Sequence, residues 1–355
     1  MKTEILPLNS FSAKKAAELI HSGNVVAFPT ETVYGLGANV FDEEAVKKIF
    51  AAKGRPADNP LIVHVASKDK ISTVASEIPE KARLAIDKFM PGPITVVLPK
   101  RKEISPLVTG GKDTVGVRIP EHKLARMFLE ECDCPIPAPS ANSSTKPSPT
   151  TAKHVFDDLN GKIPLILDGG ACSGGVESTV ISFCTETPTL LRPGLITLEM
   201  LREALGDVDV HPSVLENCKV DSVASPGMKY KHYSPKARVI IVSGSAETVC
   251  SFYDYALSLK RKPVILWNEN DKDILGSRAH YWLIEHNCIS SAARNLFALL
   301  RQVDDEGFDT VFITAVDKKD EGLSVMNRML RAAAFTVLTD SSSQEDLKTA
   351  LQING

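Results

Sequence analysis

The stretch Phe28-Pro29-Thr30-Glu31-Thr32-Val33-Tyr34-Gly35-Leu36-Gly37 continues directly from a short apolar segment, residues 25–28. Four apolar residues in a row that end at a proline are typical of a short strand buried on both faces. The apolar positions of residues 12–21, before this strand, and of residues 42–52, after the loop, recur at helical spacing. The order of helix, buried strand, polar loop and helix predicts an α/β fold with this loop at the end of a strand.

The same alternation continues along the chain. In the first half we expect further helices at 78–90, 123–131, 150–159 and 198–205, and strands at 61–65, 94–98, 114–119, 165–167, 178–183 and 189–191. Ser12 is the expected N-cap of the first helix, which Gly23 follows, and Ser148-Pro149 supplies the expected cap and first-turn proline of the helix at 150–159.

A second alternation begins at Arg238. There we expect helices at 246–259, 290–303 and 324–334, and strands at 239–242, 263–267, 281–284 and 310–315. Such alternation predicts a parallel sheet with helices on both faces. We therefore divide the chain into a first α/β domain over residues 1–210, a connecting segment over 211–236 and a second α/β domain over 237–355.

Composition limits the class of protein. The chain has 355 residues, of which 43% are hydrophobic and 24% charged, as in ordinary globular proteins with two domains. A net charge of −3 excludes a global basic field for nucleic acid. Residues 1–10 do not form a signal peptide, and no apolar run reaches the roughly 18 residues of a membrane span. We expect a cytoplasmic protein without a membrane partner.

The cysteines are seven in number and scattered, as in proteins of a reducing compartment; they are Cys132, Cys134, Cys172, Cys184, Cys218, Cys250 and Cys288. Cys132 and Cys134 are separated by one residue, but no second pair or histidine cluster completes a zinc site. We interpret them as small buried hydrophobic residues and expect no resident metal.

The usual nucleotide-binding fingerprints are missing. Gly35-Leu36-Gly37 lacks the third glycine of a dinucleotide loop. Residues 109–114 resemble the end of a Walker A loop, but Pro106 takes the place of its first glycine and Asp113 follows Lys112. A nucleotide site would therefore have to be of another kind.

Three loops at strand ends are chemically dense. The first is the opening stretch, whose hydroxyls, carboxylate and tyrosine also suit a plain turn. The second, residues 53–60, carries Lys53 and Arg55 on a segment that Gly and Pro keep out of a helix; the two cations could face one polyanion or be a solvated basic turn. The third, residues 138–142, places Ser140 and Asn142 two apart, so that both would point the same way in an extended segment.

Together these segments resemble the YrdC domain of threonylcarbamoyl-AMP synthases. The resemblance rests on the opening stretch, the K-x-R of Lys53 and Arg55 and the S-x-N of Ser140 and Asn142. Further motifs follow in the family's order: residues 91–93, 113–120, 175–179 and 191–194. The long form of these enzymes also has the linker seen here at 226–235 and a C-terminal domain with an Asn-Arg pair, here Asn327-Arg328.

The resemblance implies a fold, a reaction and a site. The fold would be a YrdC-like twisted mixed sheet with helices, followed by a smaller Rossmann-like α/β domain. The enzyme would join L-threonine, bicarbonate and ATP into threonylcarbamoyl-AMP and diphosphate, with Mg2+ accompanying the nucleotide. A downstream threonylcarbamoyl transferase complex would use the product to modify tRNA, which this chain would serve only indirectly.

The site residues also follow from the resemblance, position by position. Catalysis would involve Lys53, Arg55, Ser140 and Asn142. The threonine pocket would consist of Thr32, His64, Arg118, Ala138 and Ser178. ATP would contact Lys53, Arg55, Asn59, Thr114, Ser140, Ser148, Arg192, Tyr230 and His232. Within the apolar run 61–65, His64 could instead be a buried core histidine with satisfied hydrogen bonds.

The connecting segment has a composition unlike a flexible linker. Residues 226–235 combine prolines with two tyrosines, a histidine and two lysines, a mixture suited to packing on a surface. We expect Tyr230 and His232 to close over the occupied pocket and exclude water.

Three other functions stay open at this point. A related carbamoyltransferase would add paired C-x-x-C fingers, and this chain has no C-x-x-C. A non-enzymatic RNA-binding module would need ATP-independent, salt-sensitive RNA affinity, against which the acidic balance weighs. A nucleotide-sensing regulator would bind ATP without turnover.

Overall fold

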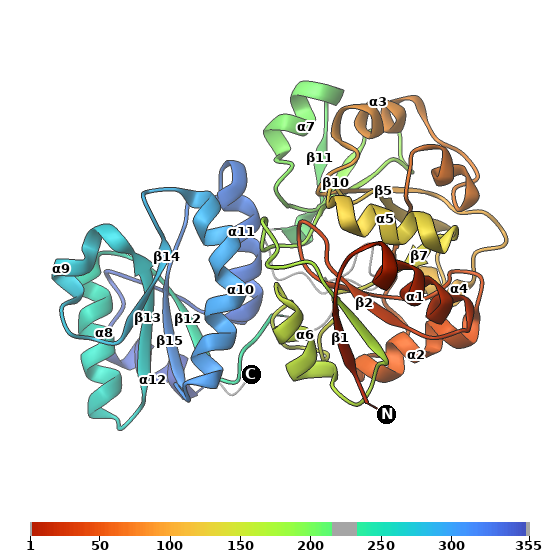
Figure 1. The fold of residues 1–355 in the computed structure, drawn as a ribbon. Coiled ribbons are helices and arrows are strands. Elements are labelled where there is room, and N and C mark those ends of the chain that lie inside the picture. The colour runs from red at the N-terminus through yellow and green to blue at the C-terminus, as the bar shows by residue number, and fades with distance from the viewer. Residues whose placement is uncertain (1, 215–232, 353–355) are drawn as a thin grey trace. The chain divides into compact units, whose positions relative to one another are not determined.

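A computed structural model of the chain describes residues 2–214 and 233–352, which form two compact units (Figure 1). Of the described residues, the first unit comprises 2–144 and 148–214, and the second comprises 145–147 and 233–352. Among the described residues, no helix has both the length and the hydrophobicity of a membrane span.

The first unit contains two sheets of mixed strand direction and several helices. Its strands are β1 (Glu4–Pro7), β2 (Val26–Phe28), β3 (Gly35–Gly37), β4 (Ile62–His64), β5 (Ile94–Pro99), β6 (Thr114–Arg118), β7 (Ile136–Pro137), β8 (Leu165–Asp168), β9 (Thr179–Ser182), β10 (Thr189–Arg192) and β11 (Asp209–Val210). Its helices are α1 (Ser10–His21), α2 (Glu43–Lys53), α3 (Glu80–Phe89), α4 (Pro106–Thr109), α5 (Lys123–Cys132), α6 (Ala152–Leu159) and α7 (Leu198–Leu205), with short 3-10 helices η1 (Asp69–Thr73) and η2 (Pro212–Val214).

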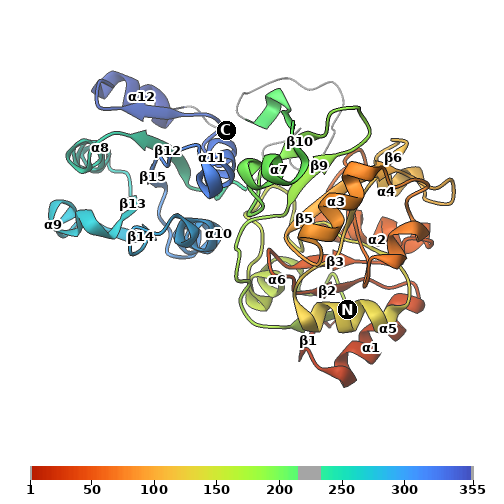
Figure 2. The same ribbon diagram turned by 90° about the horizontal axis from the view of Figure 1, so that it is seen from above.

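The smaller sheet has the strand order β1-β8-β2-β3, and the larger one the order β11-β10-β9-β5-β6-β4-β7. Helices α1 and α5 lie side by side over the smaller sheet, where Phe28 and Phe128 belong to one apolar cluster (Figure 2). The expected mixed α/β architecture is confirmed, with the strands divided between two sheets.

The two faces of the seven-stranded sheet differ in what they pack against. Because neighbouring residues of a strand point to opposite faces, one face contributes Val63, Val96, Val117 and Ile181 to the main core. The other face carries a small apolar cluster of Ile62, Val97, Val180 and Leu191. By the same alternation His64, Thr95 and Arg118 lie on this second face, which is therefore the polar one.

The second unit is a five-stranded parallel sheet with the order β14-β13-β15-β12-β16. Its elements are β12 (Arg238–Ser243), α8 (Ala246–Ser258), β13 (Pro263–Asn268), η3 (Glu269–Asp271), α9 (Lys272–Leu275), β14 (His280–Ile284), α10 (Ile289–Asp305), β15 (Thr310–Thr314), α11 (Asp320–Ala332), β16 (Val337–Thr339) and α12 (Gln344–Gln352). Helices α8, α9 and α12 cover one face and α10 and α11 the other, which confirms the expected parallel sheet and its two helical layers (Figure 2).

Three residues from the first half of the chain belong to this second unit. The guanidinium of Arg301 on α10 donates a 2.6 Å hydrogen bond to the carbonyl oxygen of Pro147, and the amide of Ser234 donates a 3.1 Å bond to that of Thr145. The stacked rings of Tyr233 and Phe297 have centroids 5.1 Å apart. The residues between Ser144 and Ser148 are thus held by the unit that follows them in the chain.

Two expected helix caps were wrong, and the helix expected from residue 324 begins at Asp320. Asn9, not Ser12, is the N-cap of α1: Asn9 accepts the amide of Ser12, whose hydroxyl caps the amide of Asn9 in return. Helix α6 is capped by Thr151, so Pro149 lies before the helix and the hydroxyl of Ser148 is left for another partner. Sequence reasoning also missed β1, β3, β7, β11, β16, α4, α9 and α12.

Candidate functional site

The opening stretch, residues 28–37, lies along residues 138–141, because backbone hydrogen bonds join the two segments. The amide of Leu36 donates to the carbonyl oxygen of Pro139 at 2.9 Å, and the amide of Ala141 to that of Tyr34 at 2.8 Å. A β-carbon on Gly35 would lie 3.3 Å from that of Ala138, a tighter contact than most side chains make, so glycine eases this close approach. Two of the three dense loops thus form one structure.

Lys53 joins the third loop to this pair. Its ammonium group donates to the carbonyl oxygens of Ser140 (2.5 Å) and Asn142 (2.8 Å) and to Oδ1 of Asn142 (3.2 Å). The hydroxyl of Ser140 donates to the same Oδ1 at 2.5 Å, so the two side chains do point the same way. The K-x-R and S-x-N motifs, separate in sequence, therefore meet through Lys53.

The expectation that Lys53 sits in a loop was wrong. Lys53 is the last residue of α2, whose end is set by Gly54 in the left-handed conformation at a φ of 63°. Lys53 is only 4% exposed, which excludes a solvated basic turn for this residue. Arg55 lies just beyond the helix, and its guanidinium donates a 3.4 Å bond to the carbonyl oxygen of Asn59.

Arg118 stands at the centre of a second group. The parallel register of β4 and β6 pairs His64 with Arg118, and both side chains are 4% exposed. Nη1 of Arg118 donates to Oγ1 of Thr32 at 2.8 Å, and Nη2 lies 2.7 Å from Oε1 of Glu31. A carboxylate and a hydroxyl from the opening stretch thus surround a buried guanidinium.

His64 is held in its neutral form. Burial, reinforced by the positive charge of Arg118, lowers the pKa of His64 to about 3. Nδ1 lies 3.2 Å from the carbonyl oxygen of Ile62, and the ring meets that of Phe28 edge to face. A neutral imidazole beside a fixed cation can exchange hydrogen bonds with a hydroxyl ligand without adding charge.

Ser178 and Arg192 form a third group on the same polar face. The hydroxyls of Ser178 and Thr95 lie 2.8 Å apart, and Arg192 donates to both the carbonyl oxygen (3.0 Å) and the hydroxyl (3.1 Å) of Ser178. In β5, Val96 pairs with Val117 of β6, so Thr95 lies alongside Arg118. These contacts connect the Arg192 group with the Arg118 group across neighbouring strands.

Two further predicted residues are buried beside these groups. Ser148 donates a 2.5 Å bond to Oε1 of Glu177. Asn59 is fully buried, and neither its Oδ1 nor its Nδ2 has a hydrogen-bond partner among the described residues. An orphaned buried amide is costly, and a ligand that supplied both a donor and an acceptor would relieve it.

Of the remaining predicted residues, Ala138 and Thr114 make no side-chain hydrogen bond to the three groups above among the described residues. Ala138 is buried, and its amide donates to the carbonyl oxygen of Ile62 at 2.8 Å. Thr114 begins β6, and its side chain is partly exposed. Tyr230 and His232 lie outside the described residues.

Three residues at the site were missed by sequence reasoning. Glu31 and Glu177 stand within quoted motifs but received no role, because an acidic side chain in a glycine-rich loop gives no sign of its partner. Thr95 lies inside an apolar strand, and its hydroxyl, a polar group in an otherwise apolar run, was the one feature that could have indicated a site role. The structure places each of them against a predicted site residue.

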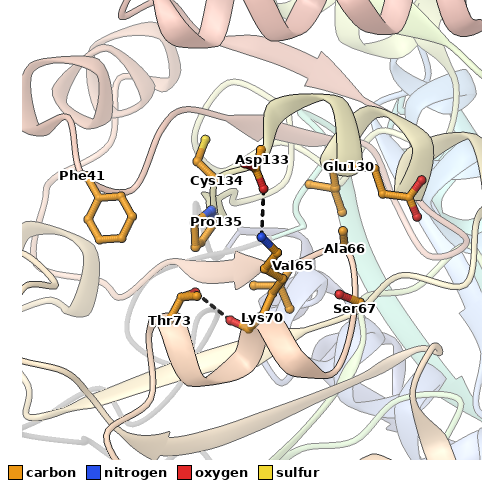
Figure 3. A pocket seen from close by; sticks show the side chains of 11 residues that line it. Phe41, Val65, Ala66, Ser67, Lys70, Thr73, Glu130, Asp133, Cys134 and Pro135 are labelled. Atoms are coloured by element: carbon orange, nitrogen blue, oxygen red, sulfur yellow. Dashed lines mark hydrogen bonds and ion pairs between the residues drawn. The ribbon is translucent and has the colours of Figure 1, made fainter.

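A separate cavity of about 300 Å³ lies between α5 and η1 (Figure 3). Its wall is mainly apolar, with Lys70 and Asp133 paired at 2.8 Å and the partly exposed ring of Phe41. Burial raises the pKa of Cys134, also in its wall, to about 11, so this thiol stays protonated at neutral pH. None of the predicted site residues lines this cavity. Within the described residues, no group of three or more His, Cys, Asp or Glu side chains could hold a metal ion.

Comparison with known proteins gives a family for each part of the chain. Residues 18–194 match a family described as "Telomere recombination", and residues 196–334 one described as "Threonylcarbamoyl-AMP synthase, C-terminal domain". A threonylcarbamoyl-AMP synthase from Pyrococcus abyssi is 45% identical over 93% of this chain and 96% of its own length. One from Bacillus subtilis is 40% identical over 95% and 97%. The crystal structure of Pyrococcus abyssi Sua5 complexed with L-threonine covers 95% of this chain and 98% of its own, with 43% identity and a TM-score of 0.88.

Because the pKa of His64 is low in the folded chain, part of the free energy of unfolding should be lost as the pH falls. The unfolded chain takes up a proton at this imidazole below about pH 6.5, and the folded chain does not until about pH 3, so stability is lost as the pH falls between these values. Between pH 7.5 and 5 this amounts to about 2 kcal/mol in the free energy of unfolding of the first unit. Denaturant titrations should show His64→Asn to lack this component and His286→Asn, whose side chain is 90% exposed, to keep it. Equal pH slopes for wild type and His64→Asn would contradict the assignment.

Proposed function

This chain belongs to the threonylcarbamoyl-AMP synthase family, and we propose that it makes threonylcarbamoyl-AMP and diphosphate from L-threonine, bicarbonate and ATP. It is an enzyme of the nucleotidyltransferase type. The product would serve a downstream threonylcarbamoyl transferase complex that modifies tRNA. The observation that carries the proposal is the buried guanidinium of Arg118, held between Thr32 and Glu31 on the polar face of the sheet.

The amino-acid half of the reaction needs a site for a small anion with a hydroxyl. In our proposal Arg118 takes the α-carboxylate of threonine, which a planar guanidinium fork binds well. Neutral His64 and the hydroxyls of Thr32 and Ser178 would line the pocket for the threonine hydroxyl, and Ala138 would contribute backbone. Bicarbonate supplies CO2 with release of water, and the amine of threonine, after losing a proton to solvent, bonds to the carbon of CO2 to form the carbamate.

The nucleotide half needs positive charge where the diphosphate leaves. The carbamate oxygen attacks the α-phosphorus of ATP, and the bond from that phosphorus to the bridging oxygen of the diphosphate breaks. Lys53, Arg55 and Arg192 would stabilise the phosphates, because phosphoryl-type transfers depend mostly on positioning and charge. Ser140 and Asn142, both tied to Lys53, would set the orientation of the phosphates, and Asn59, Thr114 and Ser148 would contact the nucleotide.

Mg2+ fits this site only as a companion of the nucleotide. Among residues 2–214 and 233–352, the side chains that would meet the phosphates are cations, hydroxyls and amides, and no carboxylate cluster lies with them. When bound, Mg2+ would neutralise part of the triphosphate charge, and this chain's own residues would hold the complex through Lys53 and Arg55.

Other expectations from the sequence remain part of the proposal. We propose a catalytic domain over residues 1–210, a docking linker over 211–236 and an α/β domain over 237–355, with Tyr230 and His232 closing over the bound substrates. We also propose a cytoplasmic location, from the odd and scattered cysteines.

Diphosphate release should require threonine, bicarbonate and ATP together. An enzyme-coupled diphosphate assay, run with each amino acid in turn, measures this. Valine should be rejected far more strongly than size alone would require, because a pocket that hydrogen-bonds a hydroxyl leaves its polar groups unpaired without one. Equal rates with valine or serine would argue against the pocket of Thr32, His64, Arg118 and Ser178, and release without bicarbonate would argue against the carbamate.

Substitutions should separate the two halves of the site. Arg118→Lys keeps the charge but loses the fork, so we expect the Kd for threonine to rise about tenfold or more and that for ATP to change little. Lys53→Ala should do the reverse. Equilibrium titrations with each ligand measure both, and Lys47→Ala, an exposed lysine in the same helix, is the matched control. Parallel losses for both ligands in both variants would show the division to be wrong.

A further inference from the structure

The ion pair of Glu31 and Arg118 contains polar atoms with unmet hydrogen-bonding capacity. Glu31 is 8% exposed and Arg118 4%. Oε1 of Glu31 and Nη2 of Arg118 lie 2.7 Å apart, but neither makes a directed hydrogen bond to a described residue. Oε2 of Glu31 and Nε of Arg118 also have no hydrogen-bond partner there, and all four atoms are buried.

Such a group of atoms is unfavourable in an empty protein interior. Buried donors and acceptors are almost always hydrogen-bonded, and charged ones carry the largest desolvation cost. Such exceptions need an explanation, and a ligand that supplies the missing donors and acceptors is one. Here the unmet donors, Nε and Nη2, form one edge of a guanidinium, and the unmet acceptor, Oε2, belongs to the carboxylate beside it.

The pair is held rigidly from both sides. Nη1 of Arg118 is fixed by Oγ1 of Thr32, which in turn lies 2.9 Å from Oγ1 of Thr30. The carbonyl oxygen of Glu31 accepts the amide of Gly174 at 2.8 Å, which fixes the backbone that carries the carboxylate. The Nε–Nη2 edge of the guanidinium and Oε2 of the carboxylate are therefore held next to each other by fixed neighbours.

This arrangement is complementary to a zwitterion. An α-amino acid carries a carboxylate and an ammonium group on one carbon, so its acceptors and donors lie side by side, as the donors of Arg118 and the acceptor of Glu31 do. We propose that Glu31 binds the α-amino group of the substrate while Arg118 binds its α-carboxylate. Glu31 is then a specificity-determining residue that selects a free α-amino acid, an inference that rests on the proposed function.

A different role for Glu31 predicts different results. If the carboxylate of Glu31 only occupies the place of the substrate's carboxylate on Arg118, removal of the Glu31 carboxylate should strengthen the binding of every carboxylate ligand. If Glu31 binds the amino group, the same removal should weaken only the ligands that have an amino group. The two roles are therefore separated by a ligand pair that differs in the amino group alone.

L-Threonine and (R)-3-hydroxybutyrate are such a pair, since the second is threonine without its amino group. Calorimetric titration of the full chain should show wild type binding threonine at least about tenfold more tightly, the worth of one charge-assisted hydrogen bond. Glu31→Gln should bring the two affinities to within about threefold, mainly by weakening threonine. Glu131→Gln, an exposed glutamate on α5, should leave the ratio unchanged.

Several outcomes would overturn the inference. Equal affinity of the wild-type chain for both ligands would overturn the inference. This test needs no variant, so it holds even if Glu31→Gln fails to fold. An unchanged ratio in a folded Glu31→Gln chain, or tighter binding of both ligands by the same factor, would overturn the inference as well. A wild-type chain that released diphosphate with threonine but failed these tests would leave the proposed function standing, whereas one that neither bound threonine nor released diphosphate would contradict both.

Discussion

The positive charge of Arg118, buried at the end of β6, is the constraint around which the first unit is organised. A buried guanidinium is stable only with a partner charge and hydrogen bonds, and both come from the stretch of residues 28–37. That stretch can reach Arg118 because its backbone is bonded to residues 138–141, where Gly35 allows close approach. The contacts that hold residues 28–37 in place are therefore also the contacts that build the proposed threonine pocket.

The seven-stranded sheet gives the site its two-part layout. One face fills the main core, so the other face is free to carry polar side chains from β4, β5 and β6. Toward the β7 end of the sheet, the ammonium of Lys53 at the end of α2 donates a hydrogen bond to the carbonyl oxygen of Ser140. Toward the β10 end, the guanidinium of Arg192 donates a hydrogen bond to the hydroxyl of Ser178. Separate elements of the fold thus present the cations that we propose for the phosphate chain and the guanidinium that we propose for the carboxylate, as a reaction between two anionic substrates would require.

Local patterns sufficed for much of this fold, and the failures have physical causes. Four strands and three helices of the second unit were predictable because the buried strands and amphipathic helices have clear periods. The strands β1 and β16 were missed because they are short, lie at sheet edges and have mostly exposed side chains. The cap of α1 was misplaced because Asn9 and Ser12 cap each other reciprocally. Glu31 received no role because its partner lies far along the chain, just as Thr32 and Arg118 are 86 residues apart. Nor does any local pattern show that residues 145–147 belong to the second unit.

The decisive measurement is a crystal structure of the chain with L-threonine bound. We expect the α-carboxylate of threonine on Nε and Nη2 of Arg118, its hydroxyl toward His64 and Ser178, and its amino group within hydrogen-bond distance of Oε2 of Glu31. Threonine bound elsewhere, with the Glu31–Arg118 pair unchanged from its 2.7 Å contact, would contradict this expectation.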